Sequence, residues 1–178
     1  MNSIKQIEVL LADRLVGRLA LTKEGLCAFE YAPDWLGSGF SISPFELPLR
    51  SGVFIAKPRP FEGGFGVFDD CLPDGWGLLI LDRYLQQKGI NPRALTLLDR
   101  LALVGSSGRG ALEFRPDHSV VTRQDYADFE KLALEAERIL DSDEYKGEGI
   151  EEFQDRGGSP GGARPKIFAR YEGKEWLG

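Results

Sequence analysis

The chain has 178 residues, 42% of them hydrophobic, which is enough for one ordinary domain or two small ones with a sizeable core. A net charge of −6 gives no basic footprint for direct nucleic-acid binding, no apolar run has the length of a membrane span, and no secretory leader opens the sequence. The two cysteines, Cys27 and Cys71, are isolated, so we expect free thiols in a reducing cytoplasm, with neither a disulfide nor a zinc site.

The first third of the chain has the pattern of β-structure. Apolar runs with β-type spacing occupy residues 7–12, 14–21 and 26–31, and short polar turns separate them. Residues 32–60 are rich in Pro, Gly and Ser, which predicts turns and short edge strands, with one strand at 52–56. We therefore expect a β-rich subdomain here.

Helical signals begin at Pro73, which with Asp74 fits the first turn of a helix that ends at Gly89. Apolar residues at helical spacing lie between them, namely Trp76, Ile80, Tyr84, Leu81 and Leu85. Asn91 as N-cap and Pro92 as first residue predict a second helix that runs to Gly105. Its buried face is marked by Leu95, Leu98 and Leu101.

The remaining elements follow a strand predicted at 110–115 and a turn at 116–119. Residues 122–125 resemble a capping box with Asp in place of Glu. The helix after them has one apolar stripe, formed by Tyr126, Phe129, Leu132, Ala133, Ala136, Ile139 and Leu140. An acidic linker at 141–155 precedes the last element, a hairpin with a strand at 167–171, a turn at Glu172 and Gly173, and a second strand at Trp176 and Leu177.

The stretch 156–166, Arg-Gly-Gly-Ser-Pro-Gly-Gly-Ala-Arg-Pro-Lys, is the main candidate site. Backbone N–H groups of a glycine-rich segment can converge on phosphate oxygens because no Cβ blocks the approach, and nearby cations add charge. Its spacing is not that of a Walker A, a Rossmann fingerprint or a protein-kinase glycine loop. From the residues alone, a phosphate cradle and a flexible connector both stay open. The candidate cofactor-binding residues are Gly158, Ser159, Gly161, Gly162, Ala163, Arg164 and Lys166.

Other polar residues carry less chemistry. Asp69, Asp70 and Asp74 suggest either a carboxylate cluster for a metal or caps around the helix of Trp76, and we favour the caps because no His or Glu completes a ligand set. The single histidine, His118, has no evident catalytic partner. We expect no metal site and no catalytic residue in this chain.

Two segments resemble a known family. The stretch 68–77, Phe-Asp-Asp-Cys-Leu-Pro-Asp-Gly-Trp-Gly, followed by 81–83, Leu-Asp-Arg, resembles the N-terminal hallmark of the HipA family of toxin kinases. Residues 159–166 are similar to that family's glycine-rich loop, and the turn at 104–112 lies between them in family order. The resemblance implies an α+β fold. A β-rich N-terminal subdomain with packed helices would span 1–115, and the start of a protein-kinase-like or phosphatidylinositol-kinase-like N-lobe would span 116–178, with the glycine-rich loop at 157–166.

The resemblance also implies an activity. Members are serine/threonine protein kinases and toxins of type II toxin–antitoxin pairs; they use ATP and Mg²⁺ and phosphorylate translation components such as aminoacyl-tRNA synthetases. Their partner is a small helix-turn-helix antitoxin that binds operator DNA, so contact with DNA is indirect. Autophosphorylation of a loop serine switches some members off, and Ser159 occupies the matching position.

The resemblance places the ATP-contacting lysine, the catalytic aspartate and the Mg²⁺-binding aspartate after Gly178, so we expect this chain to be inactive without the remainder of the kinase core. Two alternatives to this kinase interpretation stay open. One is a non-catalytic regulatory or interaction module, as in split toxins of this family. The other is a generic nucleotide-binding domain unrelated to kinases.

Overall fold

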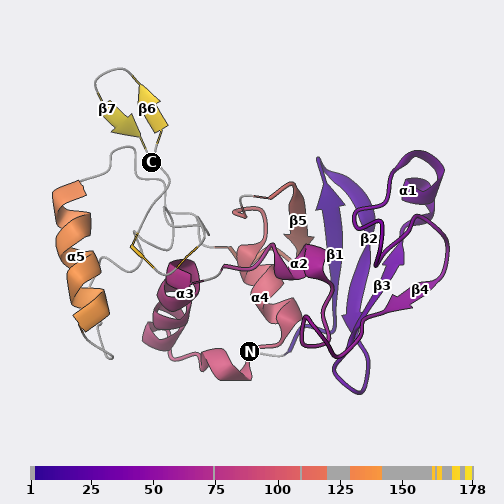
Figure 1. Cartoon of the computed structure of the whole chain (residues 1–178), viewed down its shortest axis with the longest axis horizontal. Helices are drawn as coiled ribbons and strands as arrows, with labels where there is room; N and C mark the ends of the chain where they lie inside the picture. The colour runs from indigo at the N-terminus through magenta and orange to yellow at the C-terminus, as the bar shows by residue number, and fades with distance from the viewer. Residues whose placement is uncertain are drawn as a thin grey trace. The chain divides into compact units, whose positions relative to one another are not determined.

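A computed structural model describes residues 3–73, 75–108, 110–119, 129–141, 162, 164–165, 170–172 and 175–177 (Figure 1). The chain divides into two compact units. Unit 1 comprises Met1–Leu72 and Leu95–Ser119, and unit 2 comprises Pro73–Ala94 and Val120–Gly178. The middle of the chain therefore belongs to the same unit as its C-terminal third.

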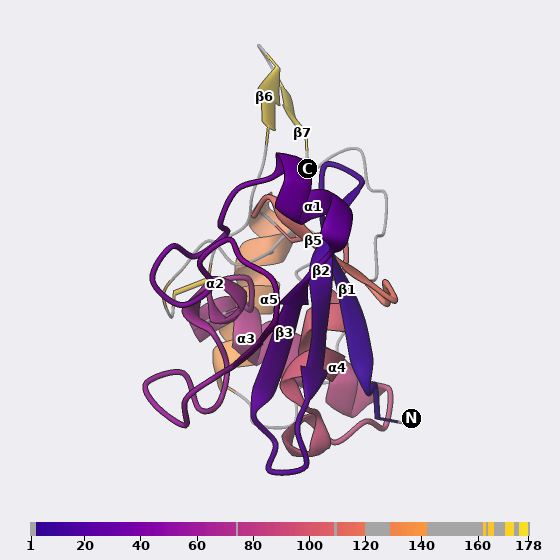
Figure 2. The ribbon, with the colours of Figure 1, turned by 90° about the vertical axis from the view of Figure 1, so that its right-hand side faces the viewer.

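Unit 1 is built on a five-stranded antiparallel sheet with the order β4-β3-β2-β1-β5. The strands are β1 (Gln6–Leu11), β2 (Arg14–Leu21), β3 (Cys27–Tyr31), β4 (Val53–Ile55) and β5 (Leu112–Arg115). Figure 2 shows β1, β2 and β3 as neighbouring strands. All five strands predicted in this part of the sequence are confirmed, and β5 returns to pair with β1 at the edge of the sheet.

The two faces of the sheet follow the period of two that strands impose. Leu19 and Phe29 are register partners and lie buried on one face. On the other face, Arg18 pairs in register with both Glu8 and Glu30, and its guanidinium lies 3.2 Å from the Glu8 carboxylate. Gly17 lies in the interior of β2, where a Cβ would collide with the Glu30 carbonyl and the Phe29 ring.

Three helices belong to unit 1, namely α1 (Pro33–Ser38), α2 (Gly66–Asp69) and α4 (Leu97–Val104). The sequence pattern predicted only turns and edge strands in the segment that holds α1. Helices of four to six residues show too little periodicity to be recognised. Pro33 and Asp34 nevertheless form the same Pro-Asp helix start that Pro73 and Asp74 suggest for the later helix. Trp35 anchors α1 in the core, and its indole N–H donates to the Phe40 carbonyl at 2.9 Å.

The predicted start of the second helix at Asn91 and Pro92 is wrong. Pro92–Ala94 forms only a 3₁₀ turn, η1, whose Arg93 N–H donates to the Asn91 side chain at 3.0 Å. The α-helix begins after Thr96, where a capping box is complete: the Thr96 hydroxyl accepts from the Asp99 N–H, and the Asp99 carboxylate accepts from the Thr96 N–H at 2.9 Å. This reciprocal cap satisfies two otherwise unpaired N–H groups. A start at Asn91 has no such reciprocal bond, because Ala94, three residues later, has no side-chain acceptor.

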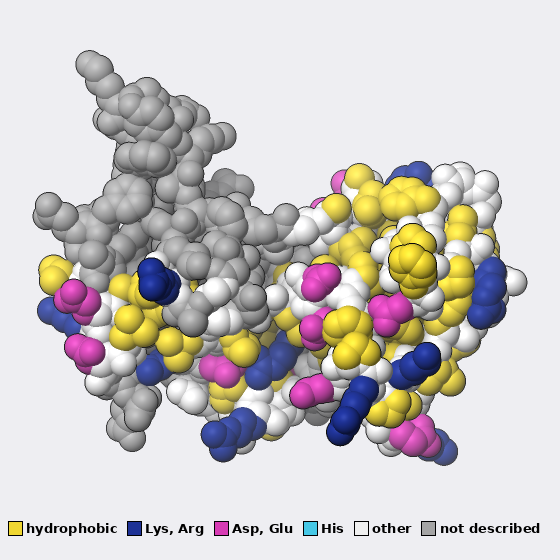
Figure 3. All heavy atoms as spheres, viewed as in Figure 1, with side chains coloured by type: hydrophobic (Ala, Val, Ile, Leu, Met, Phe, Trp, Pro, Cys, Tyr) yellow, Lys and Arg dark blue, Asp and Glu magenta, His cyan; other side chains and the backbone are white. Residues whose placement is uncertain are grey.

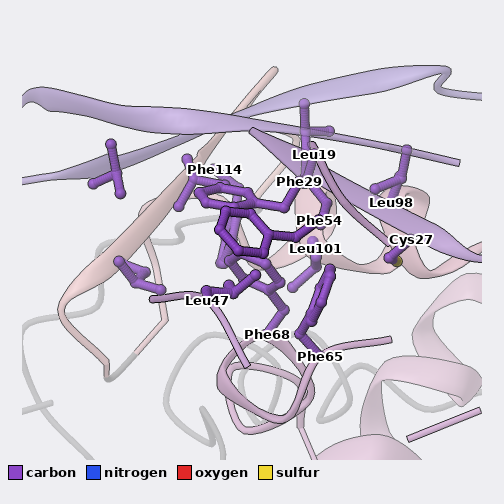
Figure 4. Packing of buried hydrophobic residues seen from close by; sticks show 14 of the residues in the cluster. Leu19, Cys27, Phe29, Leu47, Phe54, Phe65, Phe68, Leu98, Leu101 and Phe114 are labelled. Carbon is purple, nitrogen blue, oxygen red and sulfur yellow. The ribbon is translucent and has the colours of Figure 1, made fainter. Parts of the chain in front are cut away.

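The core of unit 1 is rich in aromatic side chains. Phe68, from α2, lies between Phe29 and Phe114, with ring centroids 5.5 Å and 6.4 Å away. Figure 4 shows these rings with Phe54 and Phe65 pointing toward one another beneath the sheet, together with Leu98 and Leu101 from α4. The β-strands and the two later helices of unit 1 therefore share one hydrophobic core.

Unit 2 contains α3 (Gly75–Gln87), η1, α5 (Phe129–Asp141) and a hairpin of β6 (Arg170–Glu172) and β7 (Glu175–Leu177). The predicted hairpin is confirmed in its described residues, but Glu172 lies in the first strand and not in the turn. Residues 167–169 of the predicted first strand fall outside the described residues. Helix α3 starts two residues after Pro73, a displacement that is common at helix ends. On α5, Ala136 and Ile139 are buried as predicted, whereas Leu140 is 52% exposed and lies outside the stripe. The linker was predicted at 141–155, but Asp141 is the last residue of α5. The rest of that linker and the predicted capping box at 122–125 fall outside the described residues.

The surface of unit 1 includes apolar side chains. Figure 3 shows yellow hydrophobic patches between charged side chains on its visible face. The large hydrophobic residues that are exposed among the described residues of this unit are Phe40, Phe45, Val53 and Ile55, and Phe45 is 100% exposed. Cys27 and Cys71 are free thiols. In the part of the chain that the structure describes, no helix has the length and apolar character to cross a bilayer.

Candidate functional site

The glycine-rich segment is described at Gly162, Arg164 and Pro165, all of which are exposed. Gly162 has φ +86°, a left-handed backbone that glycine adopts at no steric cost. The other candidate residues, Gly158, Ser159, Gly161, Ala163 and Lys166, lie outside the described residues. The described part of the segment thus combines bare backbone with an exposed guanidinium, two features that suit a phosphate group.

One hydrogen bond ties this segment to a distant part of the chain. The N–H of Trp76, the second residue of α3, donates to the Gly162 carbonyl at 2.8 Å. Both residues belong to unit 2. Sequence reasoning singled out both segments but missed the contact, because a backbone bond between residues so far apart leaves no local pattern.

Helix α3 is fixed on the side of this contact. Trp76 is 1% exposed and packs in a cluster with Ile80, Ala136 and Ile139. Gly75, the first residue of the helix, has φ +46°. The predicted helical face of Trp76 and Ile80 is therefore confirmed, and it binds α3 to α5.

The other end of α3 terminates as predicted at Gly89, which has φ +73°. Its N–H donates to the Gln86 carbonyl at 3.0 Å, and the Ile90 N–H donates to the Leu85 carbonyl at 2.9 Å. This pair of bonds is a Schellman motif, which satisfies the last carbonyls of the helix. Backbone groups therefore cap both ends of α3.

The prediction that the aspartates cap the helix of Trp76 is wrong for Asp69 and Asp70, which lie at the C-terminal end of α2. Asp69 is the last residue of α2 and Asp70 its C-cap, while Asp74 lies outside the described residues. Burial raises the pKa of Asp69, and the charges of Asp70 and Glu62 raise it further. Among the described residues, no group of three or more His, Cys, Asp or Glu side chains is arranged to hold a metal ion.

The glycine-rich turn between α4 and β5 is held by Asp117. Its carboxylate accepts from the Ser106 N–H at 3.0 Å, from the Ser106 hydroxyl and from the Ser119 N–H at 2.8 Å. Gly105, at φ +51°, leaves room for that carboxylate, which a Cβ would overlap. Asp117 therefore has a structural role beside this turn, and its negative charge would repel a phosphate group there.

A hollow of about 490 Å³ lies near α1, lined in part by Arg14, Arg18 and Trp35. Arg14 is already engaged, since its guanidinium donates to the Ser38 hydroxyl at 2.8 Å and lies 5.0 Å from the Trp35 ring centroid. Arg18 is paired with Glu8 at 3.2 Å. Both arginines of the hollow thus already interact with other side chains, and the hollow is not a candidate ligand site.

Two comparisons with known proteins bear on the family and the fold of this chain. The sequence model of the HipA N-terminal domain matches residues 7–115. A solved structure described as the Shewanella oneidensis MR-1 toxin–antitoxin system HipA, HipB and its operator DNA complex superimposes with a TM-score of 0.56 at 24% sequence identity. The superposition covers 96% of this chain and 37% of that chain. At that identity the likeness shows the fold, namely a mixed α and β arrangement with an antiparallel sheet, and this chain spans little more than a third of that protein.

Proposed function

This chain belongs to the HipA N-terminal domain family, and from that premise we propose that it is the N-terminal part of a HipA-like serine/threonine protein kinase, the toxin of a type II toxin–antitoxin system. The observation that carries the proposal is the extent of the likeness. The family match ends at residue 115, but the superposition covers 96% of the chain and so extends into the part that contains the glycine-rich segment.

Within this proposal, residues 116–178 begin a kinase-like N-lobe, and the segment 157–166 contacts the phosphates of ATP. The described residues fit that role, because Gly162 offers bare backbone and Arg164 an exposed cation. The phosphate-holding set would be Gly158, Ser159, Gly161, Gly162, Ala163, Arg164 and Lys166. When bound, Mg·ATP supplies the phosphoryl group and neutralises its charge. The resemblance places the Mg²⁺-binding aspartate after Gly178, so within this proposal the metal would be held by the remainder of the kinase core.

A phosphorylation assay tests the catalytic part of the proposal. The purified chain, incubated with Mg²⁺ and γ-labelled ATP, is expected to show no phosphoryl transfer, because the base and metal-binding aspartates are supplied by the rest of the core. Transfer should appear when the remainder of a HipA-type core is joined after residue 178, and Ser159 should then become labelled. Strong transfer by the present chain alone would contradict the proposal.

The proposed partner is a small helix-turn-helix antitoxin, and DNA is contacted only through it. The net charge of −6 supports indirect contact, since DNA-binding surfaces are basic. A gel-shift assay with operator DNA should show binding by the antitoxin, a further shift with both proteins, and none with this chain alone. The protein substrate is proposed to be a translation component such as an aminoacyl-tRNA synthetase. Both roles place the protein in the cytoplasm.

A non-catalytic interaction module is the second candidate. It is favoured by the closed core of unit 1, which needs no residue from outside that unit to bury Phe29, Phe68 and Phe114. Such a module would bind a separately expressed HipA-type kinase core and inhibit it in a pull-down and activity assay. A generic nucleotide-binding domain would instead bind Mg·ATP by itself in calorimetry, where we expect weak or absent binding.

A further inference from the structure

The contact between Trp76 and Gly162 is separate from the phosphate contacts proposed for the glycine-rich segment. The first N–H groups of an α-helix have no partner within the helix and need an acceptor from elsewhere. At the start of α3 the acceptor for Trp76 is the Gly162 carbonyl, 2.8 Å away. The glycine-rich segment therefore caps α3 through its backbone.

The two sides of this contact differ in how firmly they are held. Trp76 is buried against Ile80, Ala136 and Ile139, so its N–H has a fixed position. Gly162 is exposed and has φ +86°, a backbone conformation that a Cβ disfavours. The Trp76 N–H is thus fixed by the packing of its own side chain, and the Gly162 carbonyl is held in place by its hydrogen bond to that N–H.

We propose that the first turn of α3 positions Gly162 of the glycine-rich segment, with the Trp76 N–H as the holding group and the Gly162 carbonyl as the held one. This inference deepens the proposed function and takes its meaning from it, because the segment held in this way is the one proposed to contact phosphates. It also explains a feature of the sequence. The Leu-Pro-Asp-Gly-Trp-Gly stretch at 72–77 contains the turn that presents this N–H, with Gly75 at φ +46°.

Amide hydrogen exchange at Trp76, measured by NMR on the full chain without nucleotide, tests the proposal. In the unmodified protein this amide should exchange slowly, since it is hydrogen-bonded and buried. Gly162→Val should accelerate its exchange about tenfold, because a β-branched side chain at positive φ strains the backbone and moves the carbonyl. Gly162→Asn should restore most of the protection, since Asn tolerates the left-handed region.

Gly25→Val is the matched control. Gly25 lies in unit 1 with φ +82° and no atom within 4 Å of a Cβ built on it, so the substitution introduces the same strain away from the contact. It should leave exchange at Trp76 unchanged.

The reciprocal experiment starts from the helix. Gly75→Val strains the turn that presents the N–H, so the Gly162 carbonyl-carbon resonance should move upfield as its hydrogen bond weakens. The backbone order parameters of Gly162 and Arg164 should fall at the same time, whereas a bond that serves only the stability of α3 would leave them unchanged.

Three results would overturn the proposal: fast exchange at Trp76 in the unmodified chain, unchanged exchange in Gly162→Val with α3 still helical, or an unmoved Gly162 resonance in Gly75→Val. None of these readouts requires ATP. Absence of transfer after the remainder of a HipA-type core is joined after residue 178 would therefore count against the proposed function without affecting this contact.

Discussion

The two units are held together differently. Unit 1 closes one large core between a five-stranded sheet and the helices α2 and α4. In unit 2 the described core is a small cluster of two α3 residues and two α5 residues. The residues that define the fold therefore concentrate in unit 1, while the candidate phosphate-contacting segment lies in unit 2. We therefore expect that the stability of unit 1 and the proposed chemistry of unit 2 can be perturbed separately.

The family match crosses this division. It spans residues 7–115, but Pro73–Ala94 within that span packs with unit 2. The stretch that most resembles the family, at 68–77, lies where the chain passes from one unit to the other. A stretch matched as one domain by sequence thus contributes to two compact units.

Truncation of Phe68 should have the largest effect and should be confined to unit 1. The side chain is 0% exposed and packs against three other phenylalanine rings. Phe68→Ala should lower the free energy of unfolding of unit 1 by about 3–5 kcal/mol, through lost burial and the cavity left behind. Urea titration followed by hydrogen exchange in β2 and β3 measures this.

Phe45→Ala is the control, because Phe45 is 100% exposed and should change stability by less than about 0.5 kcal/mol. Equal losses for the two variants would mean that the aromatic core does not carry the stability of unit 1.

Truncation of Ile139 should affect unit 2 instead. Ile139 is 0% exposed and packs with Trp76 and Ile80. Ile139→Ala should destabilise the α3–α5 pair by about 2 kcal/mol, near the low end for such changes because a small cluster can relax around the gap. Helical ellipticity and exchange in α3 are the readouts. Leu140→Ala, at an exposed neighbouring position, is the matched control, and loss of protection in β2 would show that the units are not separable.

Asp99 should make the stability of unit 1 depend on pH. Burial alone would raise the pKa of this carboxyl, but hydrogen bonds from the Ile4 N–H and from the Thr96 hydroxyl and N–H, with the charge of His118, hold it below its ordinary value. Because the pKa is lower in the folded than in the unfolded state, the ionised Asp99 carboxylate stabilises the protein above about pH 4. This stabilisation is lost as the pH falls through the lowered pKa.

Asp99→Asn should therefore cost about 1–2 kcal/mol at pH 7 and flatten the decline in stability below pH 4. Some decline should remain, because hydrogen bonds also hold the pKa of Asp117 low against the opposing effect of burial. Parallel acid profiles for the variant and the parent would contradict this assignment.

The two thiols should report opening of unit 1 without perturbing it. Burial raises the pKa of Cys27 and of Cys71 to about 11, and the charge of Asp70 adds to the effect at Cys71. At pH 8 both should react with iodoacetamide at least about a hundredfold more slowly than an unfolded thiol. Phe68→Ala should accelerate both reactions, and Ile139→Ala neither. Rapid labelling of the parent would show that unit 1 opens readily.

Much of the local structure could be predicted from the sequence. Period-two apolar runs located β1, β2 and β3, and helical spacing with Gly89 located α3 and its end. The errors occurred where two local signals compete. Asn91 and Pro92 resemble a helix start, but the capping box of Thr96 and Asp99 forms the actual one. Leu140 fits an apolar stripe by spacing alone, yet the packing of α5 against α3 excludes it.

The candidate site was less predictable. The glycine-rich composition located the segment, and the assignment of its residues to ATP stays a prediction. Nothing in the local pattern connects Gly162 with Trp76, since their bond joins backbone groups and any residue type supplies those.

Side-chain periodicity and caps act over a few residues, so the sequence predicted the five strands of unit 1 and helix α3, and its motifs identified the family. Only the tertiary structure decided which elements share a core. The pairing of β5 with β1, the assignment of Pro73–Ala94 to unit 2 and the cap that Gly162 places on α3 all join distant residues. Such contacts depend on burial and on unpaired backbone groups that must find partners, and these are properties of the folded chain.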